Sequence, residues 1–246
     1  MNLSLVFYVI VGFIAQLIDG CLGMAYGVSS TSLLLSLGVS PGAASASVHA
    51  SELLTTAVSG ASHLKFGNVD KPLLKRLLIP GVIGGAIGAY ILSELPGNTI
   101  KPFIACYLMI MGGIILWKAF KKIQETEVKT KIIPLGLCGG FCDAIGGGGW
   151  GPIVTTTLVA RGNNPRLTIG SVNLAEFFVT VSESIVFVLT IGLVHWKIIV
   201  GLMIGGVLAA PLAAYLCGKL PRRTIMIIVG LLIVGLSIRT IILAWK

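Results

Sequence analysis

Ten apolar runs, separated by short gaps, account for most of this sequence. They fall at about 3–18, 22–38, 43–64, 73–93, 100–118, 132–145, 149–160, 167–190, 197–217 and 224–245. A helix that crosses the hydrocarbon core of a bilayer needs about 20 apolar residues, with a range of roughly 17–25. The first two runs are borderline or short for this purpose, the sixth and seventh are clearly short, and the others are long enough. The pattern predicts an all-α protein that crosses a membrane several times.

The composition argues against a soluble fold. Only 11% of the 246 residues are charged and 55% are hydrophobic, whereas an ordinary soluble domain carries about 25% charged residues. The net charge of +9 would raise nucleic acid as a partner for a soluble protein. Here, however, the basic residues lie mainly in the gaps between apolar runs, as they do in multi-pass membrane proteins. We therefore expect a protein of the cytoplasmic membrane whose partners are the lipid bilayer and a small substrate, and no nucleic acid.

The sequence contains an internal repeat. With a shift of 124 residues the two halves align without a gap from Gly12 to Ser59, and one further residue of slip extends the match to Ile100. Biased composition aligns apolar residues by accident, but it does not readily align acidic residues and prolines in one register. Identical pairs include Asp19/Asp143, Pro41/Pro165 and Glu52/Glu176. We expect two homologous membrane repeats, 1–118 and 132–246, joined by a basic cytoplasmic connector at 119–131.

Each repeat is expected to hold a short, broken pair of helices followed by three full spans. An odd number of crossings would turn the second repeat upside down in the membrane. The positive-inside rule places the connector in the cytoplasm together with the basic loops at 65–76, 161–166 and 219–223. A parallel arrangement would put the last of these loops outside, so we expect inverted repeats. The sequence does not choose between re-entrant hairpins and short spans for the broken pairs.

Polar residues at membrane depth form one stripe in each repeat. A charged side chain at that depth costs about 2.5–3.5 kcal/mol on insertion scales, and a polar stripe there must face protein or water. Interhelical hydrogen bonding is a sufficient role for the Ser, Thr and Asn side chains. For the duplicated carboxyl groups we favour a function, since burying them without a role is costly. The stripes are His49, Glu52, Thr56, Ser59 and His63, and then Asn173, Glu176, Thr180 and Glu183.

Glycine-rich breaks interrupt the two short pairs of segments, at Asp19–Gly23 and Asp143–Gly149. Glycine lets a ligand approach the backbone. A helix that restarts after a break presents free N–H groups and the positive end of its dipole, and Pro152 suits the first turn of such a helix. Two breaks from inverted halves would face each other near mid-membrane and form an anion site made mostly of backbone. The alternative is that the glycines only allow close helix packing.

The candidate site residues lie in the breaks and the stripes. For substrate binding we expect Gly23, Gly27, Ser29, Ser30, Thr31, His49, Gly147, Gly148, Gly149, Trp150, Gly151, Thr155, Thr156 and Asn173. For coupling or gating we expect Asp19, Glu52, Asp143, Glu176 and Glu183. Asp19 and Asp143 could instead hold N–H groups of the opposing turn. No catalytic residue, cofactor or metal site is expected, and the five cysteines form no CxxC or zinc-ligand pattern.

These motifs resemble the TauE/SafE family of sulfite and organosulfur-anion exporters. The pattern is Asp-x(3)-Gly-x(3)-Gly, then Gly-x-x-Pro, then Glu eleven residues after the Pro. It occurs twice, as Asp19, Gly23, Gly27, Gly38, Pro41 and Glu52 and as Asp143, Gly147, Gly151, Gly162, Pro165 and Glu176. The resemblance covers essentially the whole chain and implies a transporter of small anions such as sulfite or sulfonates. The first break departs from the family pattern, because Met24 and Ala25 stand opposite Gly148 and Gly149.

Three functions compete on this sequence. The leading interpretation is a secondary transporter that exports a small sulfur-containing anion, with Glu52 and Glu176 coupling protons or gating. The alternative is a carrier of H⁺, Na⁺ or a metal ion that uses the duplicated intramembrane carboxyl groups. A membrane-embedded enzyme fits less well, because the second repeat replaces His49 with Asn173. The sequence leaves open the substrate, the direction of transport and the coupling ion. It also leaves open whether the protein is a monomer or a homo-oligomer.

Overall fold

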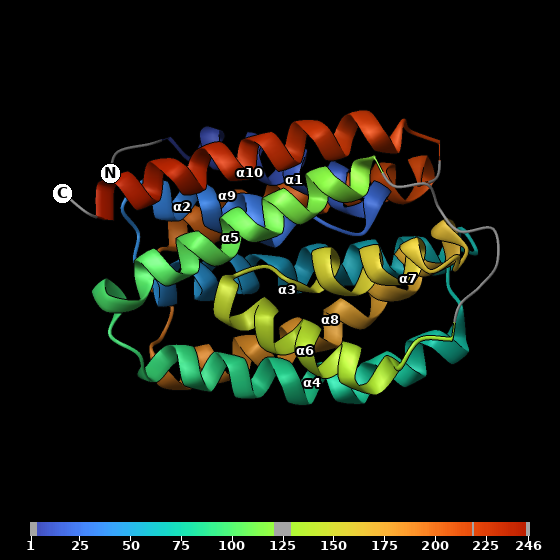
Figure 1. Ribbon diagram of the computed structural model, residues 1–246, viewed down its shortest axis with the longest axis horizontal. Helices are drawn as coiled ribbons and strands as arrows, with labels where there is room; N and C mark the ends of the chain where they lie inside the picture. Colours follow the sequence, from blue (N-terminus) through green and yellow to red (C-terminus); the bar gives the residue numbers. More distant parts are fainter. Residues whose placement is uncertain (1–3, 121–128, 218, 245–246) are drawn as a thin grey trace.

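The computed structural model describes residues 4–120, 129–217 and 219–244, and these residues fold into helices with no strand among them (Figure 1). The first half consists of α1 (Leu5–Leu22), α2 (Tyr26–Ser36), α3 (Pro41–Lys65), α4 (Lys71–Glu94) and α5 (Gly97–Ala119). The second consists of α6 (Ile132–Gly146), the π-helical turn η1 (Gly151–Thr155), α7 (Thr156–Ala160), α8 (Pro165–Thr190), α9 (Trp196–Leu216) and α10 (Arg222–Ala244). The all-α class is confirmed.

Six of the described helices, α1, α4, α5, α8, α9 and α10, are long and apolar enough to cross a membrane. Helix α3 has 25 residues and is also long enough, but it carries one of the two polar stripes, which lowers its average hydropathy. The chain is therefore a multi-pass membrane protein. Of the expected connector at 119–131, residues 121–128 lie outside the described part of the chain.

Both broken pairs are hairpins that return to the end of the bundle where they begin (Figure 1). At one end, Arg161 Nη1 donates to Lys129 O at 3.3 Å and Arg166 Nη2 donates to Phe66 O at 2.8 Å. The segment before α6, the loop after α7 and the loop after α3 therefore lie together. The loop between α2 and α3 lies at the opposite end, beside the start of α5. Each broken pair is therefore a hairpin, a geometry that re-entrant segments and pairs of short spans share.

The two halves run in opposite directions through the bundle. Helix α1 starts beside the start of α9, whereas α6 starts at the other end, beside α4 (Figure 1). The end where α6 starts carries the basic loops. Arg166 and Lys219 line one surface hollow there, and Arg76 and Lys129 line another. This clustering agrees with the basic end that the positive-inside rule requires.

The first helix of each hairpin packs along a long helix of the other half, α1 on α9 and α6 on α4. Glycines make these contacts close. A Cβ on Gly12 would overlap the backbone of Leu202, and a Cβ on Gly84 would overlap the carbonyl of Leu137. Membrane helices use small residues at such contacts because backbones that approach closely gain van der Waals packing. The hairpins are thereby fixed against the opposite half.

Helices α3 and α8 lie antiparallel at the centre and bring the two polar stripes together. Ser59 Oγ donates to Asn173 Oδ1 at 2.8 Å across their contact. All nine stripe residues are buried, none with more than 6% of its surface exposed. The expectation that the stripes face protein and not lipid is confirmed.

The breaks are shorter than the sequence indicated. Helix α1 continues through Asp19 to Leu22 and is capped by Gly23 at φ 68°, and α6 continues through Asp143 to Gly146 and is capped by Gly147 at φ 63°. Left-handed glycine caps of this kind close helix C-termini. The two aspartates therefore lie in the last turns of helices and not inside the breaks. Pro152 lies in the first turn of η1, as expected.

Candidate functional site

The two glycine-rich breaks lie against each other inside the bundle. A Cβ on Gly27 would stand 2.7 Å from Gly148 Cα, and one on Gly151 would overlap the backbone of Met24. Thr31 Oγ1 donates to Gly147 O at 2.5 Å across the same contact. Backbone from one half thus meets backbone from the other, as expected for two facing breaks.

Gly148 is the position where this contact leaves least room. Its φ is 151°, and a Cβ there would overlap the backbone of Gly27 and Val28. Gly192 also has a positive φ, 72°, but nothing lies within 4 Å of its Cβ position. We expect Gly192→Ala to cost about 1–2 kcal/mol from the left-handed backbone alone and Gly148→Ala to cost about 1–3 kcal/mol more from overpacking. Thermal unfolding in detergent measures the stability of both variants. Equal unfolding midpoints for Gly148→Ala and Gly192→Ala would contradict the close contact of the breaks.

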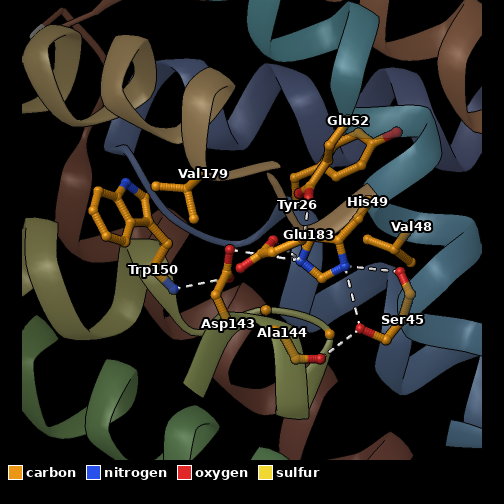
Figure 2. A network of polar contacts seen from close by, with 12 residues as sticks. Tyr26, Ser45, Val48, His49, Glu52, Asp143, Ala144, Trp150, Val179 and Glu183 are labelled. Carbon is orange, nitrogen blue, oxygen red and sulfur yellow. Dashed lines mark hydrogen bonds and ion pairs between the residues drawn. The ribbon is translucent and has the colours of Figure 1, made fainter. Parts of the chain in front are cut away.

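His49 lies at the centre of a cluster of carboxyl groups next to the breaks (Figure 2). Its Nε2 is 2.8 Å from Glu183 Oε2, 3.6 Å from Asp143 Oδ2 and 3.9 Å from Glu52 Oε2. The four side chains come from α3, α6 and α8, and all are buried. Residues from both halves of the chain therefore share one ionisable cluster.

The orientation of His49 requires a proton between it and Glu183. Its Nδ1 lies 2.8 Å from Ser45 O, a carbonyl that can only accept, so Nδ1 carries a hydrogen. Ser45 Oγ donates to Ala144 O at 2.6 Å and lies 3.2 Å from the same Nδ1. With Nδ1 protonated, neutral His49 presents a lone pair at Nε2, and a lone pair facing a carboxylate oxygen at 2.8 Å would be repelled. Either His49 is charged or Glu183 is protonated, so the pair holds one exchangeable proton.

Asp143 caps its own break. Its Oδ1 accepts hydrogen bonds from the backbone N–H groups of Gly149 and Trp150, at 2.6 and 2.9 Å. Its Oδ2 is buried and has no hydrogen-bond partner. The expectation that Asp143 would hold N–H groups of the opposing turn is wrong, because the glycine cap at Gly147 turns the chain back over the last turn of α6 and brings its own N–H groups within reach.

The first half repeats part of this arrangement. The Asp19 carboxyl group interacts with the backbone of Tyr26, at the restart of the helix after its own break. Tyr26 Oη lies 3.1 Å from Ser51 Oγ on α3. Glu176 lies within reach of charge interaction with Asp19 and Glu52. The five acidic residues expected to couple or gate are thus gathered in one region.

Most of the hydroxyl groups expected to bind substrate are already used. Ser29 donates to Ala25 O, Thr31 donates to Gly147 O, and Thr156 donates to Pro152 O and accepts from Lys118 Nζ. Two hydroxyl groups remain, since Ser30 Oγ and Thr155 Oγ1 are buried without a hydrogen-bond partner. A Cβ on Gly23 would stand 3.0 Å from Thr155 Oγ1, so this hydroxyl lies beside the opposite break.

Two expected substrate-binding residues have structural partners instead. The indole of Trp150 is fully buried, and its Nε1 donates to Val172 O at 3.1 Å. Asn173 is held between α3 and α8, with Oδ1 accepting from Ser59 and Nδ2 donating to Ile169 O at 3.3 Å. Both side chains fix the helices around the site.

The sequence analysis missed three residues that contact or adjoin the site. Ser45 orients His49, and its position four residues before His49 on one helix face was a usable signal. Tyr107 Oη donates to Gly148 O at 3.3 Å from α5. Gln16, three residues before Asp19, is completely buried, and neither atom of its amide has a hydrogen-bond partner. A lone Gln in an apolar run is a weak signal, and nothing in the sequence places Tyr107 near the break.

The cluster also has the donor atoms of a cation site. Ligand atoms of His49, Asp143 and Glu183 all lie within 4.8 Å of one another. Imidazole nitrogen with carboxylate oxygen suits several divalent ions. The arrangement can therefore exchange protons or hold a cation, while the breaks beside it offer backbone to an anion.

Two comparisons with known proteins give matches. The family model described as "Sulfite exporter TauE/SafE" matches residues 8–240. The chain is 45% identical to the "Probable membrane transporter protein YtnM" of Bacillus subtilis (strain 168), over 98% of this chain and 84% of that protein. No solved structure matches the chain.

Proposed function

Because this chain belongs to the sulfite exporter TauE/SafE family, a family of membrane transporters and not of enzymes, we propose that it exports a small sulfur-containing anion such as sulfite or a sulfonate. It would act as a secondary transporter in the cytoplasmic membrane, with its basic end in the cytoplasm. The observation that carries the proposal is the contact between the two glycine-rich breaks in the buried centre of the bundle. Backbone N–H groups at such breaks suit an anion.

We treat the two halves as inverted repeats. Contacts between helices that correspond in the expected alignment support this, since α1 packs on α9 as α6 packs on α4. The same alignment pairs position 49 with 173 and position 59 with 183. The contact of Ser59 with Asn173 is then the counterpart of the contact of Glu183 with His49. One member of this pair of contacts is neutral and the other can ionise, so the two halves of the proposed carrier differ at this contact.

The N–H groups of the second break are occupied by a carboxylate, and this suggests how a proton is coupled to the anion. Asp143 Oδ1 accepts from Gly149 and Trp150, the donors that a substrate anion would use. Hydrogen bonds to a charged acceptor are roughly twice as strong as neutral ones. A proton bound by Asp143 removes that charge and weakens its hold on the donors. The anion then takes the place of the carboxylate, so that anion and proton bind and leave together, driven by the outward concentration gradient of the anion.

The pair of His49 and Glu183 supplies the proton in this scheme. The pair holds one exchangeable proton, and His49 Nε2 lies 3.6 Å from Asp143 Oδ2. The unpartnered Oδ2 faces the histidine, while Oδ1 faces the backbone donors. A proton that moves from His49 to Oδ2 therefore arrives on the group whose charge blocks the anion site.

Flux of labelled sulfite into proteoliposomes tests this function. We expect saturable uptake that is faster when the outside is more acidic than the lumen, because proton and anion enter together. Empty vesicles under the same gradient correct for sulfite that crosses the lipid by itself. Glu94→Gln, which removes an exposed carboxyl group at the end of α4, serves as a matched variant that keeps the flux. Uptake no faster than in empty vesicles, for sulfite and for a series of small sulfonates, would contradict the proposal.

A cation carrier is the second candidate, and the three ligand atoms within 4.8 Å of one another favour it. A protein that binds a cation in its folded state gains thermal stability with cation concentration. On this alternative, Na⁺ or Mn²⁺ would raise the unfolding temperature of the purified protein, and Asp143→Asn would remove the effect. If no cation shifts the unfolding temperature while sulfite does, the anion function is the one supported.

A further inference from the structure

A groove on the outer surface of the bundle lies between α4 and α6, at the basic end and away from the carboxyl cluster. Its volume is about 600 Å³. Three cations, Lys75, Arg76 and Lys131, lie at its end nearest the loops. Ile79 and Ile83 continue along the α4 wall toward mid-membrane, and Ile133 lies on the α6 wall beside the cations. The groove therefore has a positively charged mouth and an apolar floor.

The groove follows from the way α4 and α6 meet. Gly84 and Gly136 bring the two helices into close contact farther along, where a Cβ on Gly136 would stand 3.0 Å from Pro80. Nearer the basic end the contact opens, because no small residues continue it there. Ile79 and Ile133 are each 64% exposed in the open part. In a membrane protein such exposed side chains face hydrocarbon, so the groove opens sideways into the bilayer.

Within the described part of the chain, the cations at the mouth have no carboxylate partner. Among the residues that the structure describes, no ion pair within 4.0 Å joins Lys75, Arg76 or Lys131 to an acidic side chain. All three are exposed. Lys and Arg near the headgroup level attract anionic lipids, by about 1 kcal/mol for each cation. The apolar wall beside them lies where the acyl chain of a bound lipid would run.

We propose that this groove binds one anionic glycerophospholipid, with the phosphate at Lys75, Arg76 and Lys131 and an acyl chain along the three isoleucines. The combination of charge and apolar wall favours a lipid over a free phosphate ion, which would use the cations alone. The corresponding positions on the α1 and α9 pair are Val200, Gly201 and Phe7 in the repeat alignment. These positions carry no charge, so the proposal concerns only the leaflet at the basic end. A lipid there joins α4 of the first half to α6 of the second.

The test uses the full-length protein purified in a neutral detergent. Phosphatidylglycerol is added, and both the unfolding temperature and the number of lipids retained in native mass spectrometry are followed. We expect one retained lipid and a rise in unfolding temperature, neither of which phosphatidylcholine or inorganic phosphate reproduces. The variant Lys75→Gln/Arg76→Gln/Lys131→Gln is expected to bind the lipid on the order of 100-fold more weakly. The matched control Lys65→Gln/Lys219→Gln/Arg223→Gln removes the same charge at the same end, outside the groove, and keeps the site.

A second variant separates the apolar wall from the charge. Ile83→Trp fills the groove from a side chain that is 48% exposed and faces lipid, so it leaves the core packing unchanged. We expect it to reduce lipid retention while all three cations remain. The proposal would be overturned if Lys75→Gln/Arg76→Gln/Lys131→Gln retained as much phosphatidylglycerol as the control triple variant. It would also be overturned if inorganic phosphate raised the unfolding temperature as much as phosphatidylglycerol does. Neither outcome depends on the proposed transport function, because no flux is measured.

Discussion

Replacing Asp143 with asparagine is expected to tighten the binding of sulfite and to make it less dependent on proton binding by the protein. In the proposed scheme the Asp143 carboxylate competes with the substrate for the N–H groups of Gly149 and Trp150. Asparagine can still accept from one of these groups, but it carries no charge and binds no proton. Hydrogen bonds to charged groups contribute about 1.5–3 kcal/mol each. Loss of that competition should raise the affinity for sulfite on the order of tenfold or more.

Transport by the same variant should fall even though binding improves. A carrier must release its substrate, and without a carboxylate at position 143 to compete for the N–H groups the anion leaves slowly. We expect at least a tenfold lower maximal rate, with no dependence on the pH gradient. Asp70→Asn is the matched control, since Asp70 also caps a helix, by accepting from the N–H of Leu73 at 3.2 Å, but at the basic end of the bundle. A pH profile of Asp143→Asn that matches the profile of Asp70→Asn would rule out the competition.

Replacing His49 with leucine is expected to have the largest effect on stability. Glu183 would lose the nitrogen that lies 2.8 Å from it and would remain buried without a partner. Breaking a buried pair by removing one member costs about 3–5 kcal/mol. The variant should unfold at a clearly lower temperature and show no pH-dependent sulfite flux.

A double variant separates the effect on stability from the effect on proton coupling. In His49→Leu/Glu183→Gln the unpartnered carboxyl group is gone, so most of the lost stability should return, whereas the pH dependence should not. His63→Leu is a matched buried histidine, because its Nδ1 is paired with Asn68 Nδ2 at 3.1 Å and not with a carboxyl group. If His49→Leu were as stable as His63→Leu and kept its pH-dependent flux, the shared proton would have no role.

Local patterns in the sequence were sufficient to predict the helices, the two breaks and the faces of the polar stripes. Spacing of three and four residues places side chains on one helix face, whatever the helix packs against. The burial of His49, Glu52 and Glu176 followed because lipid cannot solvate them. Pro152 at the restart of the second hairpin followed from its fixed φ. Each of these features depends only on a short stretch of chain and on the lipid that surrounds it.

The pairing within the site could not be read from the sequence, because it depends on the register between helices. His49 meets Glu183 only because α3 and α8 run antiparallel with Ser59 opposite Asn173. The error about Asp143 has a similar cause. A left-handed glycine at 147 folds the chain back onto the preceding turn, and one residue of difference in that turn decides which N–H groups the carboxylate reaches. The position of each hairpin likewise depends on the helix of the other half on which it packs.

The packing of each hairpin on the opposite half also has a consequence for biosynthesis. Helix α1 packs mainly on α9, which begins at Trp196. At about 5–20 residues per second, the ribosome needs roughly 10–40 s to reach α9 after making α1. During that time the first hairpin lies in or near the bilayer without the surface that covers it, with Gln16 and Asp19 close to its tip. The nascent first half is therefore expected to be a natural client for membrane-embedded chaperones and quality-control proteases until the second half arrives.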